Sequence, residues 1–329
     1  MSANLDFLRA IAVLCVFFAH LYERLLQQHT LPSHHFGQLG VIIFFVHTSL
    51  VLMMSLDRSK LTGRAMFQEF FVHRFFRLYP LSIVCVLIAY LVPGSTWSVR
   101  ELLTNLALTT NLTYDNVMVG GLWTLPLEVQ MYMMLPFLFV WLRKRPISWV
   151  IAFWLASIPI ALIQPGISGR LQVLSYVPCF LGGVIAWRMG TRAALPGWLW
   201  PLGLMVAALP WMTSPGNQFV FRWITCFALG LAIPLFKEMP TSWLTSASKT
   251  IAKYSYGIYL THIAALDIAF GRMSDYPMYL QGGVFAVIAI VLPLIAYHLV
   301  EAPMIRFGKQ ITANQTPAQP IPTLSRTIR

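Results

Sequence analysis

The chain has 329 residues, of which 57% are hydrophobic and only 10% are charged. Together with a mean hydropathy of +0.68, this composition excludes a water-soluble globular surface and predicts a polytopic membrane protein. The formal net charge of +12 would suggest nucleic-acid binding in a soluble chain, but here the charges must first be assigned to loops. The four cysteines lie far apart inside apolar runs, which indicates small core residues and not disulfides or a zinc site.

Ten stretches contain the roughly 20 mostly apolar residues that cross a bilayer. They are residues 5–23, 38–56, 75–93, 122–142, 147–164, 171–187, 197–213, 219–236, 254–271 and 279–300. The stretch 101–112 is too short and too polar to span, so we expect it at the interface or in a cavity. The sequence thus predicts an all-α membrane bundle of about ten transmembrane helices over residues 1–307. A disordered tail rich in Pro, Thr and Gln follows over 308–329.

The distribution of lysine and arginine predicts the orientation of this bundle. If the N-terminus is inside, the inner segments carry 17 of the 23 basic residues, and the outer segments and span ends carry only five. This asymmetry places both termini in the cytoplasm and accounts for the net charge without nucleic acid. The first span is expected to be retained and not cleaved as a signal peptide, because no small-x-small cleavage site follows it before Glu23.

Arg9 and His20 are costly residues inside the first span. They are eleven residues apart, which is about three helical turns, so both project from one helix face at an axial separation of about 16 Å. That separation matches the scale of an extended pantetheine arm, with a phosphate-pairing group at the cytoplasmic end and a potential general base deeper in the membrane. The alternative is a snorkelling arginine and a histidine that is hydrogen-bonded within the bundle.

Arg74 and Arg77, in "HRFFRLYP", lie at the cytoplasmic start of the third span. Residues three apart share a helix face, and two guanidinium groups suit a polyphosphate better than ammonium groups do. The alternative is a positive anchor at the membrane edge.

Glu128, in "WTLPLEVQMYM", enters the fourth span from the outer side. A carboxylate inside the membrane needs a partner or a cavity, and His20 is also placed toward the outer half. A contact between them would stabilise the protonated imidazole of a general base. Trp123 could support the site or belong to the interfacial aromatic belt.

In "SYGIYLTH", Tyr259 and His262 lie in the ninth span, where His262 fits either a site role or a structural hydrogen bond.

Taken together, these motifs resemble those of the membrane acyltransferase type 3 family. The resemblance covers about residues 4 to 307, and seven motifs occur in order over the ten predicted spans. The motifs are "LDFLRAIAVLCVFFAH", "GQLGVIIFFVHTSLVL", "RFFR", "TTNLTY", "WTLPLEVQMYM", "SYGIYLTH" and "VEAP". The sequence departs from the family pattern after Phe45, where the usual glycine is missing, and at Pro126, where serine is more common.

The resemblance implies an enzyme, an O-acyltransferase of the inner (cytoplasmic) membrane. His20 would be the catalytic histidine, with Arg9 required in the same helix, and Arg74 and Arg77 would hold the coenzyme A phosphates. Glu128 would support the site. Acetyl-coenzyme A would be the donor substrate, with no permanently bound cofactor, and the acceptor would be a hydroxyl of a cell-surface polysaccharide or its lipid-linked precursor. Membrane lipids and proteins of a glycan assembly system are the other expected partners.

Two other readings remain open at this stage. In a transporter or channel, His20, Glu128, His262 and Asp267 would form a proton or solute path. In a donor-side subunit, the protein would pass acetyl groups across the membrane to a partner enzyme.

Overall fold

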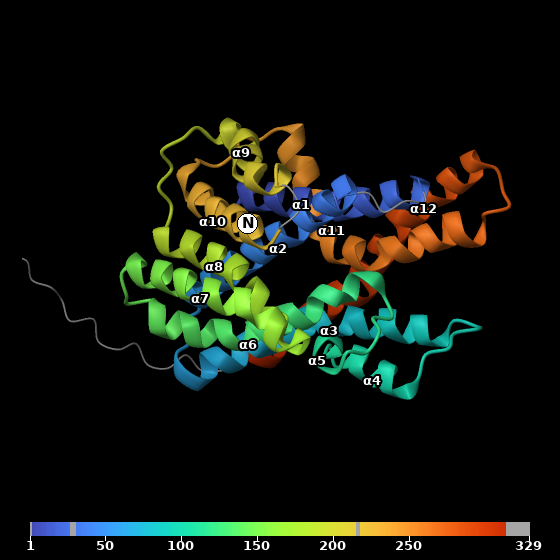
Figure 1. Cartoon of the computed structure of the whole chain (residues 1–329), viewed down its shortest axis with the longest axis horizontal. Coiled ribbons are helices and arrows are strands. Elements are labelled where there is room, and N and C mark those ends of the chain that lie inside the picture. The colour runs from blue at the N-terminus through green and yellow to red at the C-terminus, as the bar shows by residue number, and fades with distance from the viewer. Residues whose placement is uncertain (1, 27–30, 215–217, 314–329) are drawn as a thin grey trace, which may run out of the picture.

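A computed structural model describes residues 2–26, 31–214 and 218–313 (Figure 1). Its helices are α1 (Ala3–Leu26), α2 (Leu31–Arg58), α3 (Gly63–Leu91), α4 (Val99–Leu106), α5 (Thr110–Thr113), α6 (Leu125–Leu142), α7 (Ile147–Ile167), α8 (Val173–Met189), α9 (Trp200–Met212), α10 (Gln218–Ala232), α11 (Trp243–Leu266), α12 (Met278–Ile295) and α13 (Ala302–Ala313). Over these ranges the chain forms helices and no β-strand. The predicted all-α membrane fold is confirmed.

Seven helical stretches of the described residues are long and apolar enough to cross a membrane. They are Ala3–Leu26, Pro32–Arg58, Gly63–Leu91, Gly120–Leu142, Ile147–Ile167, Gly169–Met189 and Met278–Ala313. Gly197–Met212 and Phe219–Leu235 are apolar but shorter. Helix α11 is long, but its first half carries the sequence "TSASKT". The predicted count of ten spans is therefore not confirmed, although each predicted span coincides with a helix.

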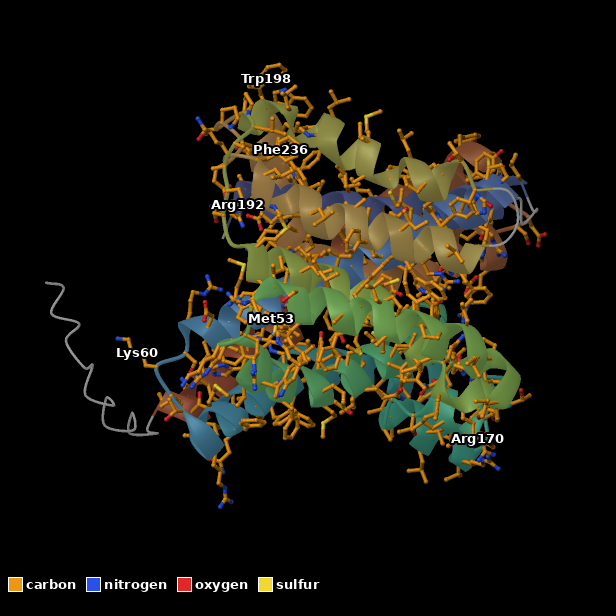
Figure 2. The ribbon with its side chains drawn as sticks, turned by 60° about the vertical axis from the view of Figure 1, so that its left-hand side comes forward. Met53, Lys60, Arg170, Arg192, Trp198 and Phe236 are labelled. Atoms are coloured by element: carbon orange, nitrogen blue, oxygen red, sulfur yellow. The ribbon has the colours of Figure 1, made fainter. Side chains whose placement is uncertain are left out.

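The long helices run up and down between two faces of the bundle. We call the face where α1 begins and α2 ends the proximal face, and the opposite one, where α1 ends and α2 begins, the distal face. Figure 2 shows Lys60 and Arg192 at one end of the molecule and Arg170 at the other. The sequence predicts that the proximal face is cytoplasmic.

Close contacts through small residues hold the central helices together. In a bilayer, helix association depends on tight packing because lipid is as apolar as a side chain, so small residues mark the interfaces. A Cβ atom added to Gly183 of α8 would overlap the Val46 carbonyl and the Ser49 hydroxyl of α2. On the same helix, Gly182 packs against the backbone of Cys226 in α10. Helix α8 thus joins α2 to α10, which lie side by side in Figure 1.

Buried tryptophans tie these helices together through backbone carbonyls. The indole of Trp154 donates to the carbonyl oxygen of Pro178 at 3.1 Å, and that of Trp223 donates to Ser175 at 2.8 Å. A buried indole N–H needs such an acceptor, because no water reaches the apolar interior to replace it.

The start of α1 is held by the connection between α10 and α11. The carboxylate of Glu238 accepts a hydrogen bond from the Ala3 backbone N–H at 2.8 Å, which is favourable at the positive end of a helix. The Asn4 side chain bonds both the Lys237 carbonyl oxygen and the Met239 N–H, each at 2.9 Å. These contacts fix the height of α1, and therefore the heights of Arg9 and His20, relative to α11.

Helix α13 extends six residues into the segment expected to be a tail. It packs on α3, where Gly308 lies against Phe76 and Thr312 is bonded to His73 at 2.9 Å. The alternation of apolar and basic residues in "MIRFGKQIT" supplies an amphipathic face that composition alone does not reveal. Residues 314–329 of the expected tail lie outside the described residues.

The tight packing of α8 against α2 leads to a prediction about the stability of the protein. We expect Gly183→Ala to destabilise the protein by about 1–3 kcal/mol, because its new methyl group collides with the α2 backbone. Gly282→Ala in α12 is the matched control, since no atom lies within 4 Å of the added Cβ. The measurement is the thermal midpoint of unfolding in detergent, followed by tryptophan fluorescence. Equal midpoints for the two variants would contradict the tight α2–α8 contact.

Candidate functional site

A cavity of about 100 Å³ lies between α1, α2, α3, α6 and α11. We call it the arginine cavity, because Arg9, Arg74 and Arg77 all line it. Its wall also contains Phe44, His47, Thr48, Thr124, Glu128, Tyr132, Ser255, Tyr256 and Tyr259. The structure therefore brings together the three predicted phosphate-binding residues and the predicted intramembrane carboxylate.

Arg9 lines the cavity and does not snorkel to the membrane surface. Its Nε donates a hydrogen bond of 2.7 Å to the Ser255 hydroxyl of α11. That hydroxyl in turn donates to the Ala252 carbonyl oxygen at 2.9 Å. Arg9 is thus fixed between two helices, with its charge directed at the same space as the α3 arginines.

Arg74 and Arg77 have different partners, although they lie on one face of α3. Arg77 forms an ion pair with Glu301, whose side chain is fully buried, and its guanidinium carbon lies 5.7 Å from the centroid of the Tyr256 ring. The Nε of Arg74 is buried and has no hydrogen-bond partner among the described residues. Arg74 is therefore the arginine with capacity to bind a ligand.

Glu128 lies among the arginines and is held by a neighbour one turn along its own helix. The Tyr132 hydroxyl donates to its carboxylate at 2.8 Å. Three arginines thus face two carboxylates, Glu128 in the wall and Glu301 behind Arg77. Among these five residues the positive charges exceed the negative charges by one, and an uncompensated charge is expensive in a low-dielectric site. An anionic ligand would compensate it.

His20 lies in a second pocket, toward the distal face, which we call the histidine pocket. Its volume is about 230 Å³, and its wall includes Trp123, Tyr259 and His262. The Nδ1 of His20 lies 3.3 Å from a carboxylate oxygen of Glu23, and the Ser33 hydroxyl donates to the other oxygen of Glu23 at 2.9 Å.

This arrangement defines the chemistry available to His20. A carboxylate beside Nδ1 favours the tautomer that carries its proton there, which leaves Nε2 as an acceptor and stabilises the imidazolium. An imidazole held in this way can act as a general base.

His262 packs beside His20, with their ring centroids 5.3 Å apart. Its Nδ1 lies 2.8 Å from the Tyr259 carbonyl oxygen. A carbonyl only accepts, so this nitrogen carries the ring proton and Nε2 is an acceptor. That Nε2 is buried without a hydrogen-bond partner in the described part of the chain. His262 therefore has both a structural hydrogen bond and a second nitrogen available to a ligand.

Tyr259 and Val41 separate the arginine cavity from the histidine pocket, because both line the two spaces. The Tyr259 hydroxyl is 2.8 Å from the Thr124 hydroxyl, at the end of the 3₁₀ turn Gly120–Thr124. A Cβ atom on Gly121 would lie 2.7 Å from the Tyr259 carbonyl oxygen, so this turn can approach α11 closely only with a glycine. The two spaces meet across one layer of side chains.

The expected contact between Glu128 and His20 is replaced by other pairs. Glu128 lines the arginine cavity, whereas His20 lines the histidine pocket beside Glu23. Position along a span gives a rough depth but not the neighbouring helix. Spacing could have identified Glu23, which lies three residues after His20 on the same helix face.

Glu301, Tyr132 and Ser255 were also missed as site residues. Glu301 lies in the "VEAP" motif, and its pairing with Arg77 spans 224 residues of sequence. No local pattern predicts so distant a partner.

The described residues contain no group of three or more side chains that could hold a metal ion. His29 lies outside the described residues. His35 is buried in α2, with its ring centroid 5.2 Å from that of Trp211.

Comparison with known proteins identifies a family. The family model described as an acyltransferase domain, of the acyltransferase 3 type, matches residues 2–298. No curated protein and no solved structure matches the chain. The matched range includes Arg9, His20, Arg74, Arg77 and Glu128 but ends before Glu301.

The pair of Arg77 and Glu301 makes the second testable prediction. Glu301→Gln should destabilise the protein by about 3–5 kcal/mol, because it leaves a guanidinium buried without its partner. The double variant Arg77→Met with Glu301→Met should recover most of that stability, since both charges are gone. The thermal midpoint in detergent measures both. If the double variant were less stable than Glu301→Gln, the pair would not be the source of the effect.

Proposed function

Because the chain belongs to the acyltransferase 3 family of membrane O-acyltransferases, we propose that it transfers an acetyl group from acetyl-coenzyme A to a hydroxyl of a cell-surface polysaccharide or its lipid-linked precursor. The observation that carries this proposal is the shared wall of Val41 and Tyr259 between a cationic cavity and a pocket containing a carboxylate-oriented histidine. The two spaces suit an anionic donor and a hydroxyl acceptor respectively.

The donor phosphates fit the arginine cavity by charge. One positive charge there lacks a partner, and guanidinium groups bind phosphate through paired, charge-assisted hydrogen bonds. Arg74 also borders a proximal pocket of about 190 Å³ whose wall contains the basic Arg58 and His73 and one carboxylate, Glu69. The bulky nucleotide would occupy this proximal region, and the narrow pantetheine arm would extend through the smaller cavity.

The acyl group would then reach His20 at the distal end of the arm. Arg9 and His20 are about 16 Å apart along α1, and Tyr259 lies between their two pockets. In our proposal the thioester passes Tyr259 and its carbonyl carbon lies beside the acceptor hydroxyl. Because the histidine pocket is distal, the acceptor would be modified from the side that the sequence predicts to be outside.

The transfer step follows from the geometry of His20. Its Nε2 accepts the hydroxyl proton as the acceptor oxygen attacks the thioester carbon, and Glu23 stabilises the resulting imidazolium. The tetrahedral intermediate collapses with cleavage of the carbon–sulfur bond. The coenzyme A thiolate leaves and takes the proton from the imidazolium, so both the ester and free coenzyme A are formed without another reactant.

His20 and Glu23 provide the first test of this function. We expect His20→Gln to lower the rate of [¹⁴C]acetyl transfer from acetyl-coenzyme A to membrane glycan by at least about 100-fold, the usual scale for a general base. Glu23→Gln should cause a smaller loss, because the imidazole remains but is less well oriented. His298→Gln, which changes an exposed histidine of another span, is the control. Unchanged transfer in His20→Gln would remove this residue from the mechanism.

Arg74 provides a separate test of donor binding. Arg74→Gln should raise the KM for acetyl-coenzyme A about 10- to 100-fold, the range expected when one charge-assisted hydrogen bond is lost. Arg64→Gln, at the exposed start of the same helix, should leave that KM unchanged. An equal effect of the two variants would indicate only a general attraction of anions to the proximal face.

A further inference from the structure

A pocket of about 360 Å³ at the distal face has no part in the chemistry described above. We call it the Arg222 pocket. Its wall includes Arg222 and Phe219 of α10, Tyr176 and Ser175 of α8, and the side chains of Gln38 and Gln172. The Arg222 pocket adjoins the histidine pocket, because His34 and Gln38 line both. A molecule long enough to extend past Gln38 would reach from Arg222 to His20.

Arg222 is buried without a carboxylate partner. Its exposed fraction is 7%, and its Nε has no hydrogen-bond partner among the described residues. All eleven acidic residues of the chain lie in the described part, and none of them lines the pocket. The guanidinium carbon instead lies 4.6 Å from the centroid of the Tyr176 ring and 4.9 Å from that of Phe219.

These aromatic contacts compensate the charge only in part. The interaction of a cation with an aromatic ring is weaker than its interaction with an anion. Removing a full charge from water also costs free energy. The ends of two helices also border the pocket, the C-terminal turn of α7 at Gln164 and the N-terminal turn of α8 at Ser175. Their dipoles are opposed and largely offset each other. The arginine therefore determines the charge preference of the pocket.

We propose that the Arg222 pocket binds an anionic group, a carboxylate or a phosphate, carried by the acceptor glycan. This inference rests on the proposed acyl transfer and specifies its acceptor class. The anion binds the guanidinium, the amide side chains of Gln38 and Gln172 bind hydroxyl groups, and the hydroxyl to be acetylated lies beside His20. The acceptor would thus be an acidic sugar or a glycosyl phosphate, and neutral glycans would be poorer acceptors.

The other pocket beside His20 does not suit such an acceptor. It has a volume of about 570 Å³ and contains Asp267 in addition to Glu23, which also lines the histidine pocket, with Arg24 as its basic residue. An anion there would face like charges, which would cost binding energy. The charge distribution favours the Arg222 side.

The test is equilibrium binding to the full-length protein in nanodiscs of phosphatidylcholine, without acetyl-coenzyme A. The probes are glucose 1-phosphate, glucuronate and neutral glucose. We expect the wild type to bind both anionic sugars more tightly than glucose, and Arg222→Gln to raise their Kd at least tenfold. Gln172→Glu, which keeps Arg222 but adds a negative charge to the wall, should also weaken anion binding. Arg170→Gln, an exposed arginine on the same face, should not.

The outcomes separate the possible ligands. If Arg222→Gln and Gln172→Glu left the binding of anionic sugars unchanged, the proposal would be wrong. If Arg222 instead retained phosphatidylglycerol when that lipid was added to the nanodiscs, and no sugar displaced it, the pocket would be a lipid headgroup site and the acceptor assignment would be overturned. Because binding is measured without the donor, loss of acetyl transfer with intact sugar binding would count against the proposed function and not against the anion site.

Discussion

The fold is organised around the compensation of charges buried inside a membrane. Arg9, Arg74 and Arg77 come from two helices, and their partners Glu128, Glu301 and Ser255 come from three further segments of the bundle. An unpaired ionised group in an apolar environment would shift toward neutrality or draw in water. The cluster therefore fixes how α1, α3, α6, α11 and the π-helical segment Ala296–Glu301 after α12 meet. The glycine contacts of α8 bring further helices close to this centre but carry no charge.

The sequence predicted the components of the site better than their pairing. Arg9, His20 and Glu128 were identifiable because ionisable residues are rare in apolar spans. Their partners depend on which helices are neighbours, and a residue's depth in its own helix does not give that. Glu23, and not the expected Glu128, lies beside His20. Glu301 pairs with Arg77 although the two residues are 224 positions apart in the sequence. The number of membrane spans was also hard to predict from hydropathy alone. Helix α11 packs against α1 and α12 although its first half is polar.

The division into two spaces accounts for how one small bundle could handle two very different substrates. A polyanion needs fixed positive charge, and a hydroxyl acceptor needs a base that is neutral before the reaction. Placing both in one cavity would bring the arginines beside His20 and disfavour its protonation. The layer at Tyr259 keeps the cationic cluster away from His20, and because both spaces border this layer, the proposed acyl arm would have to cross only these side chains.

The same wall has a consequence for the membrane itself. The arginine cavity and the histidine pocket are separated only by a layer that contains the Tyr259 ring, the Val41 side chain and the hydroxyl contact with Thr124. If acyl groups pass this layer as we propose, the layer must also close against protons and small ions. The close approach of Gly121 to α11 holds the Tyr259 backbone in this layer, so the glycine contributes to the barrier between the two spaces.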